Sequence, residues 1–424
     1  MTVKLIKNAK LYYDNQILDR DVLVENGKFK EIAPELNIED AEVIDAKHNL
    51  VTPGLVDVHV HFREPGQVHK ETIKTGSAAA AHGGFTTVGA MPNVTPVPDD
   101  VDKFKHQIEL NQQSSIKTLQ YAPVTLEETS DKLSPIEDLD AAGAFAFSND
   151  GHGINNAKTM FDAMQRIAQL NSHLAAHVED QNLFNKGVIN AGATATKLGL
   201  PAIERVAETS QLARDLLLAK ETGVHYHVCH ISTADSVQLI RIAKDAGINV
   251  TCEVTPHHLL LSDADIIEND ANFKMNPPLR SETDREALIA GVLDGTIDMI
   301  ATDHAPHAVD EKNQGFLKSA FGITGIETSF PLMYKLFVKS GMMNIKRLLD
   351  IMSTRPAELF GLDAGRIQLD KAADFTIIDL NEEYYFKKED FLSKGVNTPF
   401  VGSEWNCFGK IKKTFVNGEE VYSD

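Results

Sequence analysis

The stretch Leu55-Val56-Asp57-Val58-His59-Val60-His61 is a short apolar run that ends in two histidines one residue apart. Seven more short apolar runs follow it, most of them separated by residues with a helical pattern. These runs are Thr86–Met91, Lys117–Pro123, Gly143–Asn149, Leu174–Val178, His225–His230, Ile248–Val254 and Ile297–Thr302. The helical patterns include Thr72–His82, Ala157–Leu170, Ala202–Glu221 and Ala234–Ala246. Eight strand–helix repeats predict an α/β fold, a (β/α)8 TIM barrel.

The same periodicity also allows an open, doubly wound sheet. Polar residues favour the barrel, because they recur where the predicted strands end: His59, His61, Asn93, Asp150, His177, His230 and Asp303. A barrel brings its strand ends to one face, where active sites form, whereas an open sheet would spread them apart. Neither of the glycine-rich nucleotide-binding motifs occurs, so nucleotide binding gains no support.

The two ends of the chain have a different sequence pattern from the middle, with alternating residues and hairpin signals. Alternating runs at Val3–Ile6 and Asp21–Val24 precede the hairpin signal Asn26-Gly27, and a second Asn-Gly pair closes the C-terminal stretch at Asn417-Gly418. We therefore expect both termini to form one small β-sandwich domain, residues 1–52 with 365–424, beside a barrel of residues 53–364.

Composition limits the function classes. The chain has 424 residues and a formal charge of −20, which argues against nucleic acid or an anionic membrane as a partner. No apolar run is long enough for a membrane span, and Met1 to Lys10 resembles a strand rather than a signal peptide. Three scattered cysteines favour a reducing compartment. We expect a cytoplasmic protein whose substrate, if anionic, needs a local cationic pocket.

The histidines and aspartates at the strand ends predict a metal site. Side chains two apart on a strand point the same way, so His59 and His61 form a natural pair of ligands. Adding His177, His230, Asp150 and Asp303 gives a nitrogen and oxygen set that suits zinc. This set is larger than one tetrahedral ion needs. We therefore predict two ions bridged by Asp150, with His59 and His61 on one and His177 and His230 on the other.

Residues around this set predict amide hydrolysis. A hydroxide held between two metals is a nucleophile at neutral pH, and Asp303 can take a proton from it and pass that proton to a leaving nitrogen. Arg63, Asn93 and His307 lie just beyond predicted strands and form a candidate carboxylate pocket. Asn276 and the backbone at Phe321-Gly322 are further candidate substrate contacts. His152, His257, His258 and His304 are interpreted as supporting groups, Cys229 as a buried small residue, and Ala308–Phe316 as a mobile loop.

The motifs resemble those of the amidohydrolase superfamily. Pro53-Gly54-Leu55-Val56-Asp57-Val58-His59-Val60-His61-Phe62-Arg63 resembles the signature of its cyclic amidases. The segments Met91–Asn93, His230–Thr233, Met275–Arg280 and Ala301–His307 resemble the dihydroorotase family in particular. The likeness runs from Pro53 to the Gly322 region. Strand 4 carries Asp150 where many relatives have a carboxylated lysine, which is similar to long-chain, Gram-positive-type dihydroorotases.

The resemblance implies reversible, zinc-dependent cyclisation of N-carbamoyl-L-aspartate to (S)-dihydroorotate and water in pyrimidine biosynthesis. It implies that Asp303 is the catalytic acid/base and a further metal ligand. Some relatives with the aspartate hold only one metal firmly, so the expectation of a second zinc rests on less than that of the first. The substrate-binding set becomes His61, Phe62, Arg63, Asn93, Asn276, His307, Phe321 and Gly322. A homodimer and an association with aspartate transcarbamoylase stay open.

Two other functions stay open at this point. One is hydrolysis of another cyclic ureide or imide, as in allantoinase or hydantoinase; Asp150 and the trio Arg63, Asn93 and His307 speak against it. The other is a non-catalytic scaffold barrel, which the complete set of metal-ligating histidines disfavours.

Overall fold

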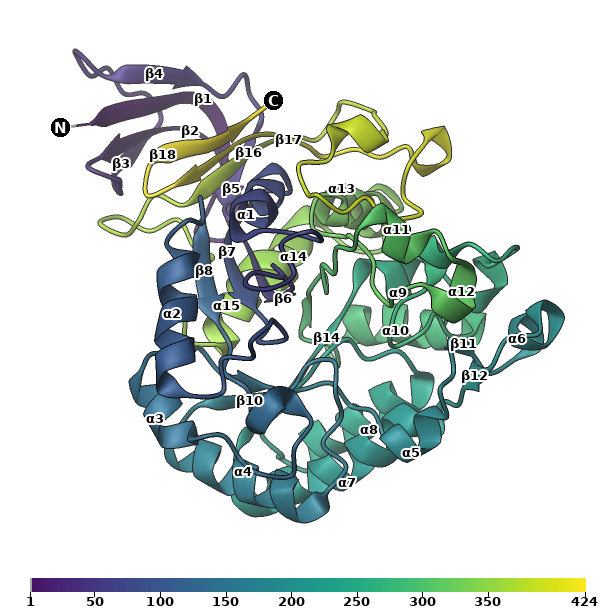
Figure 1. The fold of residues 1–424 in the computed structure, drawn as a ribbon. Helices are drawn as coiled ribbons and strands as arrows, with labels where there is room; N and C mark the ends of the chain where they lie inside the picture. Colours follow the sequence, from purple (N-terminus) through teal and green to yellow (C-terminus); the bar gives the residue numbers. More distant parts are fainter. Residues whose placement is uncertain (1) are drawn as a thin grey trace.

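The computed structural model describes residues 2–424, and its centre is a barrel of parallel strands (Figure 1). A three-stranded and a five-stranded parallel set lie side by side, and isolated bridges from Ala122 to Phe147 and from Val60 to His304 close the ring. The strands in ring order are β6 (Leu55–Val60), β7 (Phe85–Ala90), β8 (Lys117–Gln120), β9 (Phe147–Ser148), β10 (His173–Ala176), β13 (His225–Val228), β14 (Val250–Val254) and β15 (Met299–Ile300). The predicted barrel is confirmed.

Helices surround the barrel and connect its strands (Figure 1). The first begins where the sequence pattern places it, because the Thr72 side chain caps the helix by accepting a hydrogen bond from the backbone N–H of Thr75. The longer helices are α1 (Ile73–His82), α2 (Val101–Asn111), α4 (Ala157–Gln169), α7 (Val206–Thr222), α8 (Ala234–Asp245) and α10 (Glu282–Asp294). Shorter ones are α3 (Ile136–Ala141), α5 (Gln181–Phe184), α6 (Ala193–Leu198), α9 (Pro256–Leu260), α11 (Val309–Lys312), α12 (Gly315–Lys318), α13 (Ser329–Met333), α14 (Ile345–Leu349) and α15 (Arg355–Leu359).

Both termini meet in one eight-stranded sheet beside the barrel, as predicted (Figure 1). The N-terminal part joins the C-terminal part where β5 pairs antiparallel with β16. Its strands are β1 (Val3–Tyr13), β2 (Gln16–Glu25), β3 (Lys28–Ala33), β4 (Glu42–Asp45), β5 (Leu50–Pro53), β16 (Phe375–Asp379), β17 (Lys410–Val416) and β18 (Glu419–Ser423). Both Asn-Gly pairs turn hairpins, with positive φ at Asn26, Gly27, Asn417 and Gly418. The predicted strand at Met1–Lys10 corresponds to β1, with Met1 outside the described residues.

The apolar core has separate parts. The largest cluster fills the space between the strands and their helices, a smaller one fills the barrel interior, and two belong to the terminal sheet. Phe386, Phe400 and Cys407 belong to the largest cluster, so the segment between β16 and β17 packs on the barrel rather than in the sheet. Within residues 2–424 no helix is both long and apolar enough to cross a membrane.

Several elements differ from the sequence prediction, among them β15, which covers only Met299–Ile300 of the predicted run Ile297–Thr302. The helix predicted over Ala202–Glu221 begins only at Val206, because Ala202 and Ile203 form β12, which pairs with β11 (Ile189–Asn190). The fourth barrel strand covers only Phe147–Ser148, where the run Gly143–Asn149 predicted a longer one.

Candidate metal centre and substrate pocket

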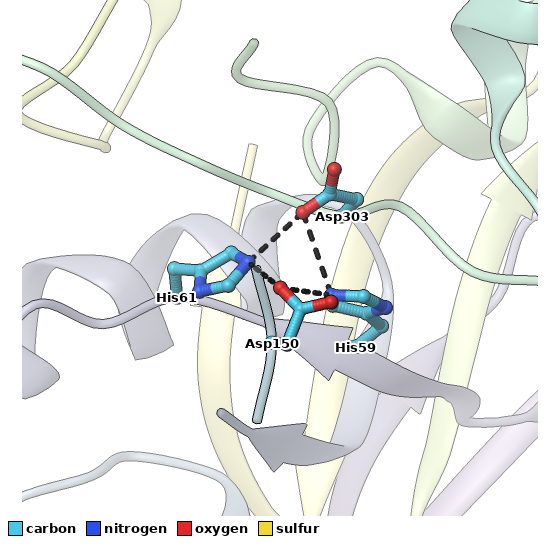
Figure 2. A group of neighbouring side chains, drawn as sticks. All are labelled: His59, His61, Asp150 and Asp303. Atoms are coloured by element: carbon cyan, nitrogen blue, oxygen red, sulfur yellow. Dashed lines mark hydrogen bonds and ion pairs between the residues drawn. The ribbon is translucent and has the colours of Figure 1, made fainter. Parts of the chain in front are cut away.

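His59 and His61 lie at the end of β6 and face two carboxylates from other strands of the ring (Figure 2). Nε2 of His59 is 3.3 Å from Asp150 Oδ2 and 3.5 Å from Asp303 Oδ1. Nε2 of His61 is 3.4 Å and 2.9 Å from the same two oxygens. All four side chains are buried. The strand alternation that makes both histidines point one way therefore produces a cluster of two nitrogens and two oxygens.

The other oxygen of Asp150 faces a second cluster. Asp150 Oδ1 lies 3.2 Å from His230 Nε2 and 3.6 Å from His177 Nδ1, and these two nitrogens are 3.1 Å apart. His177 follows β10 and His230 follows β13, so adjacent strands bring them together. The structure thus brings all six predicted metal ligands together in two groups that share Asp150.

The donor atoms fit a divalent cation. In each group the nitrogen and oxygen atoms lie within 4.8 Å of one another. The buried Nε2 of His59 has no hydrogen-bond partner within residues 2–424, although burial normally requires one. Neutral imidazole nitrogens and carboxylate oxygens are the ligands that zinc prefers. A cation between these atoms would satisfy both the unpartnered nitrogen and the buried carboxylates.

The electrostatics of the two groups favour a cation. Burial raises the pKa of Asp150, but the opposing effect of His59, His177 and His230 is larger and brings this pKa well below its usual range. Burial likewise opposes ionisation of Asp303, yet hydrogen bonding with His61 and the charge of His59 bring its pKa to about 2. Burial lowers the pKa of His59, but Asp150 and Glu253 raise it well above its ordinary value. The carboxylates therefore stay ionised and create a negative potential at His59, where a proton and a metal ion compete.

Residues that hold the ligand side chains were not recognised in the sequence. Glu253, near the end of β14, accepts a hydrogen bond from His59 Nδ1 at 2.5 Å. Asp57 accepts from the backbone N–H of His59 at 3.0 Å and from the Thr302 hydroxyl at 2.5 Å. Both acids stand inside apolar strand runs, and that position is the signal that could have revealed them, since a buried acid needs partners.

The predicted substrate residues divide into two groups around the metal ligands. Arg63 is buried, and its guanidinium lies 3.5 Å from His307 Nε2 and donates to Pro306 O at 3.3 Å. His307 Nε2 lies 2.7 Å from Phe321 O, and burial together with Arg63 lowers the pKa of His307 to about 2. Arg63, His307 and Phe321 form one group. Because the imidazole is neutral, Arg63 carries the positive charge there.

Asn276 lies in the other group. Its Nδ2 donates to Glu179 Oε2 at 2.7 Å and lies 3.4 Å from His177 Nε2. Asn93 contacts one of the predicted metal ligands: its Oδ1 accepts from His61 Nδ1 at 2.8 Å. Asn93 therefore orients a predicted metal ligand, in addition to its predicted role in binding substrate.

Phe62 and Gly322 can contribute to the predicted substrate site only through their backbone atoms. The Phe62 side chain packs in the main core against Gly76 of α1, so only its backbone can face the pocket. Gly322 has φ +141, and a Cβ there would lie 2.7 Å from Ala305 O. Only glycine fits at that bend.

The segment predicted as a mobile loop, Ala308–Phe316, contains α11 and leads into α12. The buried Lys312 side chain donates to the carbonyl oxygens of Lys274, Ala320 and Gly322 at 2.9, 3.0 and 2.8 Å. The other predicted supporting residues take different positions. His257, His258 and His304 are buried, and His258 hydrogen-bonds Thr255 and Pro277, whereas His152 is exposed. Cys229, predicted as a buried small residue, lies in the barrel interior.

Comparison with known proteins supports one family. A family model described as dihydro-orotase-like matches residues 48–236. The chain is 54% identical to a dihydroorotase of Lactobacillus leichmannii over 419 residues, covering 99% of this chain and 98% of the relative. It is 55% identical to the dihydroorotase of Ligilactobacillus salivarius over 423 residues, with the same coverage.

The solved structures with similar folds include other cyclic amidases. An L-hydantoinase (dihydropyrimidinase) from Arthrobacter aurescens superposes with a TM-score of 0.88 at 27% identity, covering 100% of this chain and 96% of that one. A dihydropyrimidinase from Brevibacillus agri gives 0.87 at 23% identity, covering 100% and 95%, and shows the fold alone. Identity above one half over almost the whole length decides between these relatives: the chain belongs to the dihydroorotase family.

Proposed function

We propose that this chain interconverts N-carbamoyl-L-aspartate and (S)-dihydroorotate with release or uptake of water, using His59, His61, Asp150, His177, His230 and Asp303 as ligands of two zinc ions. The observation that carries the proposal is Asp150, which directs one oxygen to each of two histidine groups beside the buried cation Arg63. The full-length identity to dihydroorotases supports the reaction.

His59, His61, Asp150 and Asp303 would hold one ion, and Asp150, His177 and His230 the other. Divalent ions supply Lewis-acid polarisation of an amide carbonyl and bring the pKa of water towards neutrality. Asn93 fixes the proton of His61 on Nδ1, which leaves Nε2 free as the ligand.

Asp303 moves the proton. Its Oδ1 faces the two imidazoles, and Figure 2 shows its second oxygen pointing away from both. In the ring-opening direction an ionised Asp303 takes a proton from the attacking water and delivers it to the leaving ring nitrogen. In the ring-closing direction it takes the proton from the carbamoyl nitrogen and returns it to the departing water oxygen. The low pKa of Asp303 supports its starting as the base.

Arg63 and Asn93 hold the substrate carboxylate on one side of the metals, and His307 lines the substrate site beside Arg63. Asn276 holds the substrate on the side of His177, and the backbone at His61-Phe62 and Phe321-Gly322 lines the space between. The chain has a net charge of −20, so an anionic substrate needs a local positive charge, and the buried Arg63 supplies it to the substrate carboxylate.

The test is a substrate comparison on the zinc-loaded full chain. Turnover of dihydroorotate and carbamoyl-aspartate, with little or none of hydantoin or allantoin, is expected. Turnover of hydantoin alone would instead assign another cyclic amidase. No turnover and no bound metal at saturating zinc would assign a scaffold. Metal analysis in the same samples distinguishes one zinc per chain from two.

Several finer assignments belong to the same proposal. They are the domain limits 1–52 with 365–424 and 53–364, a cytoplasmic location, a homodimer and an association with aspartate transcarbamoylase. Sedimentation of the chain alone and mixed with aspartate transcarbamoylase tests the last two.

A further inference from the structure

A column of polar side chains runs through the barrel interior away from the metal ligands. Much of the barrel interior is an apolar cluster that includes Val56, Val58, Tyr121 and Met299. Strands β13 and β14 interrupt it with acidic, hydroxyl and imidazole groups, which are His225, His227, Thr251 and Glu253. His59, His227 and Glu253 are fully buried. Buried polar groups in a packed core require an explanation, because apolar residues would fill the same space without needing partners.

The column forms an unbroken hydrogen-bonded chain. Glu253 Oε1 lies 2.5 Å from His59 Nδ1, and Glu253 Oε2 lies 3.1 Å from His227 Nε2. Nδ1 of His227 lies 2.8 Å from the Thr251 hydroxyl oxygen, and the same oxygen lies 2.8 Å from His225 Nε2. Glu253 Oε1 also accepts from the backbone N–H of His230 at 3.3 Å. One carboxylate therefore contacts a ligand of each metal group.

The hydrogens in this chain have one consistent direction when the imidazoles are neutral. An ionised Glu253 only accepts, so His59 must carry its proton on Nδ1 and His227 on Nε2. Nδ1 of His227 is then an acceptor and takes the single hydroxyl proton of Thr251. The Thr251 oxygen in turn accepts from His225 Nε2. Because His59 donates through Nδ1, its lone pair is on Nε2, the atom that faces Asp150 and Asp303.

We propose that Glu253 is a positioning residue for the metal centre: it fixes the tautomer and ring orientation of His59, while His227 and Thr251 hold its second oxygen in place. This inference rests on the metal part of the proposed function. Glu253 contacts neither the proposed ion nor the substrate and acts through His59 and the backbone of His230. A hydrogen-bonded partner of this kind raises the affinity of a metal-ligating histidine.

The test measures zinc affinity by competition with a chromogenic chelator at one fixed pH. Glu253→Gln keeps the shape but replaces one acceptor oxygen with an N–H donor, so either His59 or His227 loses its acceptor. We expect zinc binding to weaken by about 10- to 100-fold in Glu253→Gln. Thr251→Val, which removes only the far link, should weaken it less. Turnover should return towards the parent value at saturating zinc, with the KM for dihydroorotate unchanged.

Asp215 provides a matched control. It is an equally buried carboxylate, on α7, and it accepts hydrogen bonds from Tyr226 and Gln211 without contacting a proposed ligand. Asp215→Asn should leave zinc affinity unchanged. The proposal is overturned if Glu253→Gln binds zinc as tightly as the parent, or if Asp215→Asn loses as much affinity. If Glu253→Gln does not fold, Thr251→Val decides: unchanged zinc affinity in that variant overturns the proposal.

The zinc measurement also separates this inference from the assigned reaction. A parent chain that binds zinc but does not turn over dihydroorotate would refute the proposed function, while weaker binding by Glu253→Gln would still support the positioning role. A parent chain that binds no zinc refutes both.

Discussion

Replacing Arg63 with methionine tests how the pocket recognises a carboxylated substrate. The guanidinium is buried and carries a full charge, and the groups that it contacts are a backbone carbonyl and a neutral imidazole. Burial lowers the pKa of Arg63 to about 10, so it remains protonated at neutral pH. Of its five N–H donors, one is 3.3 Å from Pro306 O and another group is 3.5 Å from His307. Most of its hydrogen-bonding capacity is therefore available to a substrate.

The expected loss follows from two charge-assisted hydrogen bonds in a fork. Each contributes about 1.5–3 kcal/mol, and water replaces part of this in the variant. A net loss of about 3 kcal/mol corresponds to a rise in KM of roughly 100-fold. Arg63→Lys keeps the charge but loses the fork, so it should show a smaller rise, about 10-fold.

The assay measures kcat and KM for dihydroorotate together with zinc content. Zinc content should stay near the parent value, because Arg63 contributes no ligand atom to either metal group. Arg241→Met serves as a control, since that arginine pairs with Asp294 on the surface and should change nothing. An unchanged KM in Arg63→Met at normal zinc content would refute the carboxylate pocket.

Three further predictions concern the proton, the metal and a buried acid. Asp303→Asn should lower kcat by at least about 100-fold and retain most of the zinc, because five other ligands remain; metal analysis beside kinetics checks this, and a retained kcat removes Asp303 from proton transfer. Chelation should lower the thermal midpoint, since zinc binds the folded chain, and added zinc should restore it; a midpoint that ignores the chelator contradicts a metal centre. Burial raises the pKa of Asp215 to about 6 from 3.8, so the folded state binds this proton more tightly than the unfolded state, and this group adds stability as pH falls through 6. Between pH 7 and 4.5 the parent should gain about 2 kcal/mol over Asp215→Asn in denaturant titrations, and a difference that does not vary with pH counts against that pKa.

The sequence predicted the ring and the six candidate ligands that the structure brings together, because both depend on local patterns. His59 and His61 follow from strand alternation, and His177, Asp150, His230 and Asp303 follow from the position of each at a strand end. The same alternation could have indicated that the Phe62 side chain points away from His61 and into the core. That residue was grouped with its neighbours by motif alone.

What the sequence did not predict depends on contacts between distant segments. Glu253 and His59 are 194 residues apart, and no sequence pattern near Glu253 indicates that it contacts His59. The contacts of the Lys312 side chain with three backbone carbonyls could not be predicted either, since backbone acceptors have no sequence signature. The C-terminal stretch resembled a single β-unit, yet Asn397 within it accepts from the backbone N–H of His307 at 2.9 Å.

Asp150 shows how a short side chain can bridge two groups of histidines. A carboxylate on a single methylene reaches less far than a carboxylated lysine, so its backbone must lie close to the ligands. Asp150 lies beyond the end of β9 rather than within it, and the neighbouring Asn149 fixes that turn. Asn149 Oδ1 accepts from the backbone N–H groups of Val124 and Thr125 at 2.9 and 3.2 Å, and its Nδ2 donates to the Thr125 hydroxyl at 2.7 Å. The buried Asn149 side chain thus fixes the backbone that carries Asp150 directly after the short strand β9.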